Sequence, residues 1–340
     1  MVGLPKPTMT EQYFSANNPC KATTFFSGIP TIDLKIPQAK SLMVKACEDL
    51  GCFKLTNHGV PMEAISELES QAVDFFSLPL TLKQRAGVPN PFGYGNKHIG
   101  RNGDVGWVEY LLLTTNPDYN SLRLSPVFGT NTEKIQRALN NYISYVRKMV
   151  CEVLELVAEG LEIEPRNVWS KMVMNEQSDS VFRLNHYPPC PELAGSNNGG
   201  NVVGFGEHTD PQIISVLRSN NASGFQICLG DGTWVSVPPD ESSFFINVGD
   251  SLQVMTNGRL KSARHRVMAN GLKSRVSMIL FNGPPLSERI APLPSLIKQS
   301  NQQSLYKEFS WFEYKQSAYA SRLSDNRLAQ FEITPSRKLF

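Results

Sequence analysis

Three residues in the second half of the chain carry side chains that commonly bind metal ions: His208, Asp210 and His265. His208 and Asp210 lie two positions apart in a strand-like stretch, where alternate side chains point to the same side of the backbone. By itself this His-x-Asp pattern also fits a polar loop, but His265 on a later predicted strand completes a set of two histidines and one carboxylate. Such a set is typical of non-haem Fe(II) sites with open coordination positions, and zinc is the alternative metal.

Arg275 and Ser277 follow His265 by ten and twelve residues and lie on one face of a predicted alternating strand. An arginine directed into an apolar interior is unfavourable unless it meets an anion. Its planar guanidinium suits a carboxylate, to which the serine hydroxyl adds a further donor. The pair therefore predicts a carboxylate site, with a salt bridge inside the protein as the alternative for Arg275.

Alternation also separates the side chains of the stretch Asn185-His186-Tyr187. Asn185 and Tyr187 point one way, whereas His186 points the other way and is interpreted as structural. His58 follows a strand in an Asn-His-Gly turn, so it is predicted to hydrogen-bond in that turn rather than to bind metal. Glu207 faces away from its histidine neighbour, so a zinc hydrolase would lack a well-placed general base.

These residues fall in a β-rich region between residues 180 and 284, which must position them. Turn residues separate short β-rich runs there, at 181–187, 202–206, 212–217, 225–229, 233–237, 243–247, 251–256, 264–268 and 275–281. Asp231-Gly232 is a strong hairpin signal within this region. About eight short strands at this spacing favour a double-stranded β-helix, or jelly roll.

Helical patterns precede and follow the β-rich region. Helices are predicted at 37–50, 61–79, 132–163 and 165–174, with strands at 29–34, 52–56 and 109–115. The long helix carries one continuous apolar stripe, which indicates a core-facing side: Ile135, Leu139, Ile143, Val146, Val150, Leu154, Val157 and Leu161. The Gly/Asn/Pro-rich stretch 88–107 is predicted as an irregular, functional loop, and an aromatic-rich helical tail follows residue 300.

The fold prediction is thus a mainly β core with flanking helices, a helical N-terminal region and a helical C-terminal tail. It divides the chain into a flexible lead-in (1–28), an N-terminal region (29–130), long support helices (131–180), the jelly-roll core (181–284) and the tail (285–340). No internal repeat interrupts this order, and no linker separates independent domains.

Composition excludes several classes of partner. The 340 residues are 41% hydrophobic and 19% charged with a net charge of +2, so no strong field recruits nucleic acid or a membrane surface. Six cysteines are scattered without a Cys-x-x-Cys pair, which favours reduced thiols: Cys20, Cys47, Cys52, Cys151, Cys190 and Cys228. Because no secretion signal or membrane-length apolar run occurs, a cytoplasmic location is predicted, with the nucleus as a second candidate compartment.

The combined motifs resemble the plant 2-oxoglutarate/Fe(II)-dependent dioxygenases over residues 29–330. The motifs are His208-Thr209-Asp210, the distant His265, Arg275-Val276-Ser277 and Asn185-His186-Tyr187-Pro188-Pro189-Cys190, together with the N-terminal stretches Ile29–Leu34 and Cys52–Val60. The resemblance implies that His208, Asp210 and His265 bind Fe(II). It also implies that Arg275 and Ser277, assisted by Tyr187 and Asn185, bind the co-substrate 2-oxoglutarate, which is consumed with O2. Ascorbate is expected to support the reaction.

Within that family, three stretches resemble the gibberellin 2-oxidases that act on 19-carbon gibberellins: 94–97, 103–110 and 203–218. This implies 2β-hydroxylation, and so inactivation, of bioactive gibberellins, coupled to decarboxylation of 2-oxoglutarate to succinate. A rigid apolar diterpenoid with a carboxylate needs aromatic walls and a cationic anchor. The candidates are Trp107, Tyr110, Phe205 and Tyr314 for the walls, and Lys97, His98 or Arg101 for the acid.

Two alternatives stay open at this point. The same chemistry could act on another plant small molecule, such as a flavonoid, an alkaloid or another hormone. A non-catalytic jelly-roll binding protein is the second alternative, although it has no need for Arg275 and Ser277 beside a complete triad. The sequence leaves the oligomeric state open, and a buried Cys190 thiol is favoured over an intermolecular contact. The glycine-rich loop and the aromatic tail are predicted as lids over the barrel.

Overall fold

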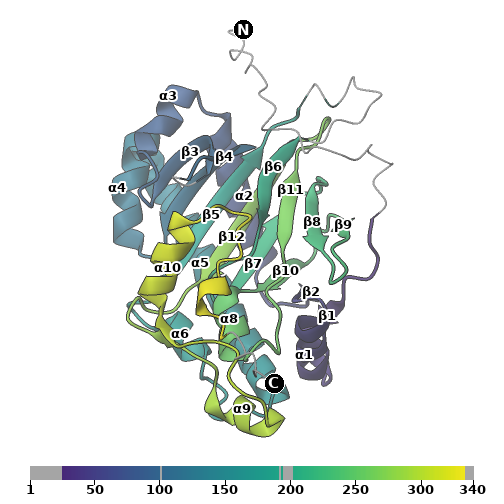
Figure 1. Cartoon of the computed structure of the whole chain (residues 1–340). Helices are drawn as coiled ribbons and strands as arrows, with labels where there is room; N and C mark the ends of the chain where they lie inside the picture. The colour runs from purple at the N-terminus through teal and green to yellow at the C-terminus, as the bar shows by residue number, and fades with distance from the viewer. Residues whose placement is uncertain (1–24, 100–101, 191–192, 194–201, 334–340) are drawn as a thin grey trace.

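Two β-sheets pack face to face in the computed structural model, which describes residues 25–99, 102–190, 193 and 202–333 (Figure 1). The larger sheet has the order β1 (Thr31–Asp33), β2 (Cys52–Thr56), β10 (Phe244–Val248), β7 (Ile214–Ser219), β12 (Arg275–Asn282), β5 (Val181–Tyr187), β4 (Asp104–Thr114) and β3 (Gly93–Ile99). The smaller sheet has the order β6 (Val203–His208), β11 (His265–Met268), β8 (Phe225–Cys228) and β9 (Trp234–Ser236). This is the double-stranded β-helix that the sequence predicts. The predicted lead-in up to residue 24, together with Cys20 and Arg101, lies outside the described residues.

Most of the predicted strands between residues 181 and 281 are confirmed, but the one at 251–256 is wrong. That segment is the helix α8 (Asp250–Met255), which begins directly after Gly249. Leu252, Val254 and Met255 are buried, so their apolar character is satisfied equally well by a short buried helix. An apolar run of this length does not distinguish a strand from a helix by its periodicity.

The prediction of an irregular loop at residues 88–107 is also wrong over most of its length. β3 and β4 form an antiparallel pair there, with Gly95 opposite Tyr110. A Cβ atom on Gly95 would lie 2.3 Å from the Tyr110 ring, and one on Gly106 would lie 2.1 Å from the carbonyl oxygen of Gly204. These two glycines therefore permit close approach between strands rather than marking a loop.

Helices cover the outer face of the larger sheet: α1 (Ala39–Asp49), α2 (Met62–Ser77) and α5 (Thr132–Gly160), with α3 (Leu80–Lys83), α4 (Pro117–Phe128) and α6 (Ser170–Met174) beside them. Every residue of the apolar stripe predicted for the long helix is buried. Tyr142 of α5 contacts the rings of Phe182 and Phe244 on the sheet. Each buried aliphatic side chain of this kind contributes about 1.5–3 kcal/mol of stabilisation.

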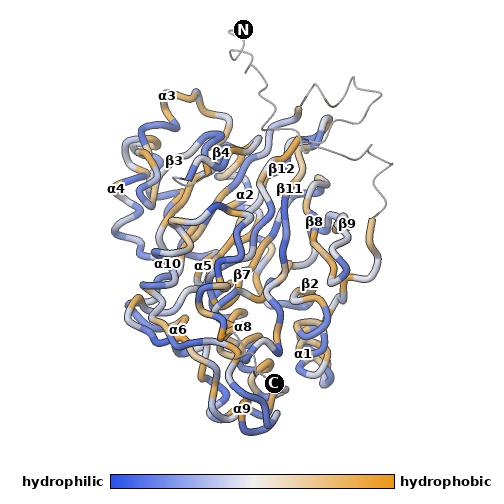
Figure 2. The backbone as a smooth tube through the Cα atoms, in the orientation of Figure 1, coloured by the Kyte–Doolittle hydropathy of each residue, from blue (hydrophilic) through white to orange (hydrophobic). Residues whose placement is uncertain are grey.

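The C-terminal segment adds β13 (Arg289–Ile290), α9 (Pro294–Ser300), β14 (Phe309–Ser310) and α10 (Trp311–Ala320). Ser310 caps α10 through a capping box with Glu313. Figure 2 shows the flanking helices as alternating hydrophobic and hydrophilic stretches, as expected for elements with one buried side. No helix among the described residues is both long enough and apolar enough to cross a membrane.

Strand register decides which side chains share the inner face of the larger sheet. Arg275 pairs with Tyr187, Ser277 with Asn185, and Ile279 with Arg183 across β12 and β5. Directly paired residues of neighbouring strands point to the same side, so these six side chains line one surface. β4 and β7 extend that surface with Tyr110, opposite Asn185, and with Leu217, opposite Ile279.

Candidate metal centre and active site

The smaller sheet brings the three candidate metal ligands together. β6 and β11 pair antiparallel with His208 directly opposite His265. The Asp210 Oδ1 atom lies 3.7 Å from the Nε2 atom of His208 and 3.6 Å from that of His265. One ligand atom from each residue lies within 4.8 Å of the other two, an arrangement that suits a single bound metal ion.

Both histidines are oriented by backbone carbonyl groups. Nδ1 of His208 lies 2.8 Å from the Gly206 carbonyl oxygen, and Nδ1 of His265 lies 3.0 Å from that of Ala263. When Nδ1 carries the proton and donates it to a carbonyl, the Nε2 lone pair is left for a metal ion. Burial, and then the neighbouring His265, hold the pKa of His208 well below its ordinary value, which favours the neutral ring that a metal requires.

Asp210 is held by two neighbours. The Ser215 hydroxyl donates to Oδ2 of Asp210, which leaves Oδ1 directed toward the histidines. The Asp250 backbone N–H donates to the Asp210 carbonyl oxygen at 2.7 Å. The Asp250 carboxylate in turn accepts from the Thr209 hydroxyl at 3.0 Å and from the Tyr314 hydroxyl at 2.6 Å. Hydrogen bonds from Ser215 and Asp250 therefore hold Asp210 in the connection that follows β6.

Replacing Ser215 by alanine is expected to weaken Fe(II) binding by about 10- to 100-fold, the usual effect of removing a hydrogen bond to a metal ligand. The reason is that Asp210 loses the donor that orients its carboxylate. Anaerobic titration with Fe(II) measures the change. Ser170→Ala is the matched control, because the Ser170 hydroxyl also donates to a carboxylate, Oε1 of Glu155 at 2.8 Å, but on α6. Equal Fe(II) affinity in Ser215→Ala and the wild type would contradict the orienting role.

Arg275 and Ser277 carry hydrogen-bonding atoms that the described protein atoms leave unsatisfied. Arg275 is 1% exposed and Ser277 is fully buried. Nε and Nη1 of Arg275 and the Ser277 hydroxyl have no hydrogen-bond partner among the described residues. The guanidinium carbon lies 5.4 Å from the centre of the Tyr187 ring. A buried cation with free donors and an adjacent hydroxyl fits an anionic ligand, so the residues present suit a carboxylate co-substrate.

One residue of this surface was missed by the sequence analysis. Arg183 lies on β5 on the same face as Asn185 and Tyr187, and its Nε donates to the Asn185 Oδ1 atom at 2.7 Å. The alternation that placed Asn185 and Tyr187 also includes residue 183, two positions earlier. The alternation of side chains along this strand was therefore a signal that could have identified Arg183.

The predicted substrate-wall residues lie in different surroundings. Phe205 is buried with its ring centre 4.7 Å from that of His208, and Tyr110 is buried with its hydroxyl on the His98 carbonyl oxygen at 3.1 Å. Trp107 is half-buried and donates through Nε1 to the Pro188 carbonyl oxygen at 2.9 Å. Tyr314 donates to the Asp250 carboxylate, and its ring contacts Phe309, Trp311 and Phe331.

The predicted acid anchors at the end of β3 are less enclosed. Lys97 is half-buried with a backbone φ of +64°, and His98 is exposed. Arg101, the third candidate, lies outside the described residues. Of the predicted substrate residues, the structure brings Phe205 and Tyr110 to the two sheets' inner faces and leaves Tyr314 in the core of the C-terminal segment.

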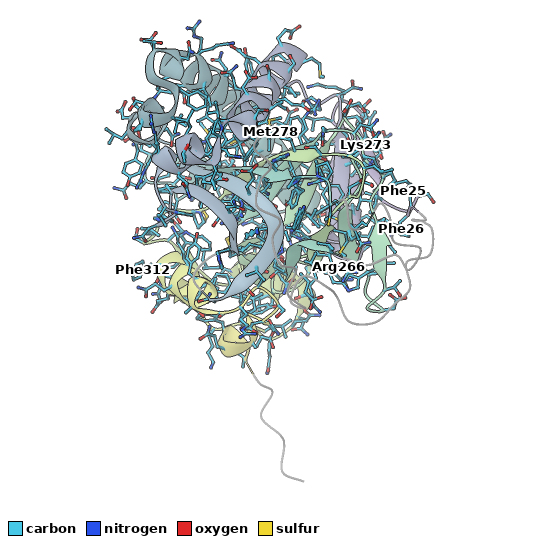
Figure 3. The ribbon with its side chains drawn as sticks, turned by 90° about the horizontal axis from the view of Figure 1, so that it is seen from above. Phe25, Phe26, Arg266, Lys273, Met278 and Phe312 are labelled. Carbon is cyan, nitrogen blue, oxygen red and sulfur yellow. The ribbon has the colours of Figure 1, made fainter. Side chains whose placement is uncertain are left out.

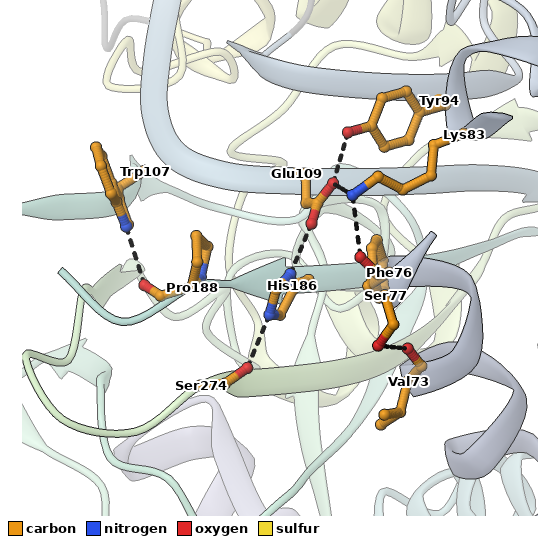
Figure 4. Close-up of polar contacts among 10 residues, drawn as sticks. All are labelled: Val73, Phe76, Ser77, Lys83, Tyr94, Trp107, Glu109, His186, Pro188 and Ser274. Carbon is orange, nitrogen blue, oxygen red and sulfur yellow. Dashed lines mark hydrogen bonds and ion pairs between the residues drawn. The ribbon is translucent and has the colours of Figure 1, made fainter. Parts of the chain in front are cut away.

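The structural interpretations of His186, His58, Glu207 and Cys190 are confirmed. His186 contacts Oε1 of Glu109 and the Ser274 hydroxyl, each at 2.7 Å, in the polar network of Figure 4. The same carboxylate, through Oε2, accepts from Lys83 at 2.6 Å and Tyr94 at 2.5 Å. His58 accepts from the Val60 N–H, Glu207 pairs with Arg264 at the surface, and Cys190 is buried.

The turn between β3 and β4 is bonded to the C-terminal segment. The Asn102 side-chain amide donates to the carbonyl oxygens of Tyr319 and Ser321, each at 2.6 Å. The Leu323 N–H donates to the Asp104 carboxylate at 3.0 Å. Leu323 also packs against the cluster that contains Phe205. The two segments predicted as lids are therefore joined to each other, while their movement stays a prediction.

Comparison with known proteins agrees with this arrangement. Residues 178–284 match the 2OG-Fe(II) oxygenase superfamily, and residues 29–132 match the family described as non-haem dioxygenase in morphine synthesis N-terminal. The chain is 63% identical to gibberellin 2-beta-dioxygenase 1 of Pisum sativum and 59% identical to gibberellin 2-beta-dioxygenase of Phaseolus coccineus, over 98% of each chain in both cases. Its fold is similar to that of JOX2 in complex with 2OG, Fe and JA, with a TM-score of 0.81 at 24% identity, covering 96% of this chain and 94% of that one.

Proposed function

Since the chain belongs to the gibberellin 2-beta-dioxygenases of the 2OG-Fe(II) oxygenase superfamily, we propose that His208, Asp210 and His265 hold its Fe(II). The enzyme hydroxylates gibberellins at the 2β position, which inactivates the bioactive hormones, and couples this to conversion of 2-oxoglutarate to succinate. The most direct support for this ligand assignment is that two histidine ring nitrogens and one carboxylate oxygen lie within 4.8 Å of one another.

We further propose that Arg275 and Ser277 bind the far carboxylate of 2-oxoglutarate. Their unsatisfied donors lie on the same inner face as Asn185 and Tyr187, which complete the polar end of the co-substrate site. Bound Fe(II) with 2-oxoglutarate and O2 supplies the oxidising power for the hydroxylation. The chain's own residues orient the Asp210 carboxylate and the far carboxylate of 2-oxoglutarate, and burial favours the neutral ring of His208.

For the substrate, we propose that Tyr110 and Phe205 form the apolar wall beside the metal ligands. Both are buried on the inner surface. Trp107, Lys97, His98 and Arg101 are proposed as outer contacts nearer the turn of β3 and β4. Tyr314 is proposed as a supporting residue, because its hydroxyl bonds the Asp250 carboxylate.

Incubation with Fe(II), ascorbate, 2-oxoglutarate and a bioactive 19-carbon gibberellin tests the proposed function. The expected product is one oxygen atom heavier, carries a 2β-hydroxyl group and forms with one succinate per turnover. Mass spectrometry and the position of the new hydroxyl group measure this. A panel of flavonoids, alkaloids and other hormones serves as the control, and faster succinate release with one of these would identify a different prime substrate.

Two further assignments from the sequence remain proposals. The five-segment division of the chain is supported by the element order, with the metal and co-substrate residues all between 181 and 284. A cytoplasmic location, with the nucleus as second candidate, is supported by the scattered cysteines. A fluorescent fusion seen only in a secretory compartment would contradict it.

A further inference from the structure

Arg183 is a second arginine on the inner face of the larger sheet. It is part-buried, while its Nη2 atom is fully shielded from solvent and has no hydrogen-bond partner among the described residues. Among the described residues, the guanidinium hydrogen-bonds to the Asn185 side chain, to which its Nε donates. The two N–H groups of Nη2 are therefore enclosed without an acceptor among the described residues.

Two aromatic rings from different sheets hold this guanidinium. Its central carbon lies 3.9 Å from the centre of the Tyr110 ring on β4 and 4.8 Å from that of the Phe205 ring on β6. A guanidinium stacked on aromatic faces keeps its in-plane N–H groups available for a planar anion. The Phe205 ring also lies beside His208, so the cation is placed next to the proposed metal centre.

Several enclosed cations among the described residues have a carboxylate partner, whereas Arg183, like Arg275, has none. Lys83 pairs with Glu109 at 2.6 Å, Lys54 with Asp240 at 3.3 Å, and Lys315 with Asp179 at 2.7 Å. Among the described residues no carboxylate oxygen lies within 4.0 Å of Arg183. A shielded cation without a counter-ion is unfavourable, and burial accordingly lowers the pKa of Arg183. An anionic ligand would remove this cost.

The ligand for Arg183 is distinct from the one for Arg275. Tyr187 is the register partner of Arg275, and it lies four residues from Arg183 along β5. Four residues of a strand span about 13 Å, so the two arginines serve separate anions. The second anion must also present apolar surface, because Tyr110 and Phe205 flank the guanidinium.

We propose that Arg183 binds the carboxylate of the gibberellin substrate and selects the acid over neutral analogues. This inference rests on the proposed function, since it assigns the anchor within the same substrate site. It moves the main acid contact from Lys97, His98 and Arg101 at the turn of β3 and β4 to the interior of the barrel. Tyr110 and Phe205 then pack against the skeleton next to the bound carboxylate.

Steady-state kinetics of Arg183→Met with a gibberellin free acid and its methyl ester test the proposal. The variant removes the charge and keeps a side chain of similar length. The kcat/KM for the acid is expected to fall about 10- to 100-fold, because a charged hydrogen-bond pair is lost. The kcat/KM for the methyl ester should change little, so the ratio of kcat/KM for the acid to that for the ester falls by the same factor. The KM for 2-oxoglutarate should stay constant. Arg183→Lys should recover part of the ratio.

Arg266→Met is the matched control. Arg266 lies on β11 (Figure 3), donates from Nε to the Gln226 Oε1 atom at 2.8 Å and stacks over Trp234 at 4.1 Å, the same pattern on a different face. The Arg266→Met variant should leave the acid-to-ester ratio of kcat/KM unchanged. Equal losses for acid and ester in Arg183→Met, or a raised KM for 2-oxoglutarate, would overturn the anchor and assign Arg183 a structural role through Asn185. Absence of gibberellin turnover in the wild type would instead contradict the proposed function. In that case, binding of the acid is measured with the Fe(II)-free protein. Binding by the wild type that is lost in Arg183→Met would still support the anchor.

Discussion

Replacing His208, Asp210 or His265 by alanine is expected to lower turnover at least about a thousand-fold, a loss of about 4 kcal/mol or more in transition-state stabilisation. Each residue supplies one of the three proposed ligand atoms, which lie within 4.8 Å of one another among the described residues. Loss of one ligand therefore removes the metal rather than merely distorting its site. Product formation from gibberellin and the Fe(II)-dependent rise in Tm measure the effect.

The Tm measurement separates metal loss from misfolding. A metal that binds only the folded state stabilises it, by about 2.7 kcal/mol at a hundred times its Kd, and the three variants should lose this increment alone. Without metal, their Tm should stay near that of the metal-free wild type. Glu207→Ala is the matched control from the same stretch, because Glu207 pairs with Arg264 at the surface. A variant of the three that keeps full activity would be removed from the ligand set.

Arg275→Ala is expected to raise the KM for 2-oxoglutarate roughly 30- to 1000-fold, which corresponds to about 2 to 4 kcal/mol of binding free energy. Arg275 is 1% exposed and its Nε and Nη1 atoms have no partner among the described residues, so its interaction with a carboxylate is shielded from water. The KM for gibberellin should change far less. Initial rates at varied 2-oxoglutarate and saturating gibberellin measure the change.

Arg275→Lys and Arg264→Ala complete this test. Lysine keeps the charge but not the planar pair of donors, so its KM for 2-oxoglutarate should lie between those of the wild type and Arg275→Ala. Arg264 is an exposed arginine on the segment before β11 and should be replaceable without effect. A larger rise in KM for gibberellin than for 2-oxoglutarate in Arg275→Ala would show that the arginine binds the prime substrate.

Alternation along strands explains how much of the site could be predicted from the sequence. The side chains of a strand alternate strictly, so His208 and Asp210, or Arg275 and Ser277, could be placed on common faces before any fold was known. The same rule applied to β5 reaches Arg183, but a lone arginine in a sequence is usually exposed. Its unusual position depends on Tyr110 from β4 and Phe205 from β6, which no local pattern connects to it.

The segments that were predicted wrongly are those whose structure depends on distant partners. Residues 93–107 look like a loop because glycine disfavours a strand locally, yet Gly106 is required where a Cβ atom would meet the Gly204 carbonyl oxygen. Residues 251–256 look like a strand, yet Asp250 begins a helix whose first turn binds Asp210 and Tyr314. In both cases tertiary contacts override the local preference.

The sequence by itself predicted the type of site: the proposed ligand set His208, Asp210 and His265, and the proposed carboxylate-binding pair Arg275 and Ser277. These follow from side-chain chemistry and from a period of two, which are local properties. Only the tertiary structure decided which side chains hold the site residues in place and which rings surround Arg183. Ser215 on Asp210, and the two rings around Arg183, come together through sheet pairing between strands far apart in the chain. Such long-range pairing depends on the packing of the whole core, so a local sequence pattern does not predict it.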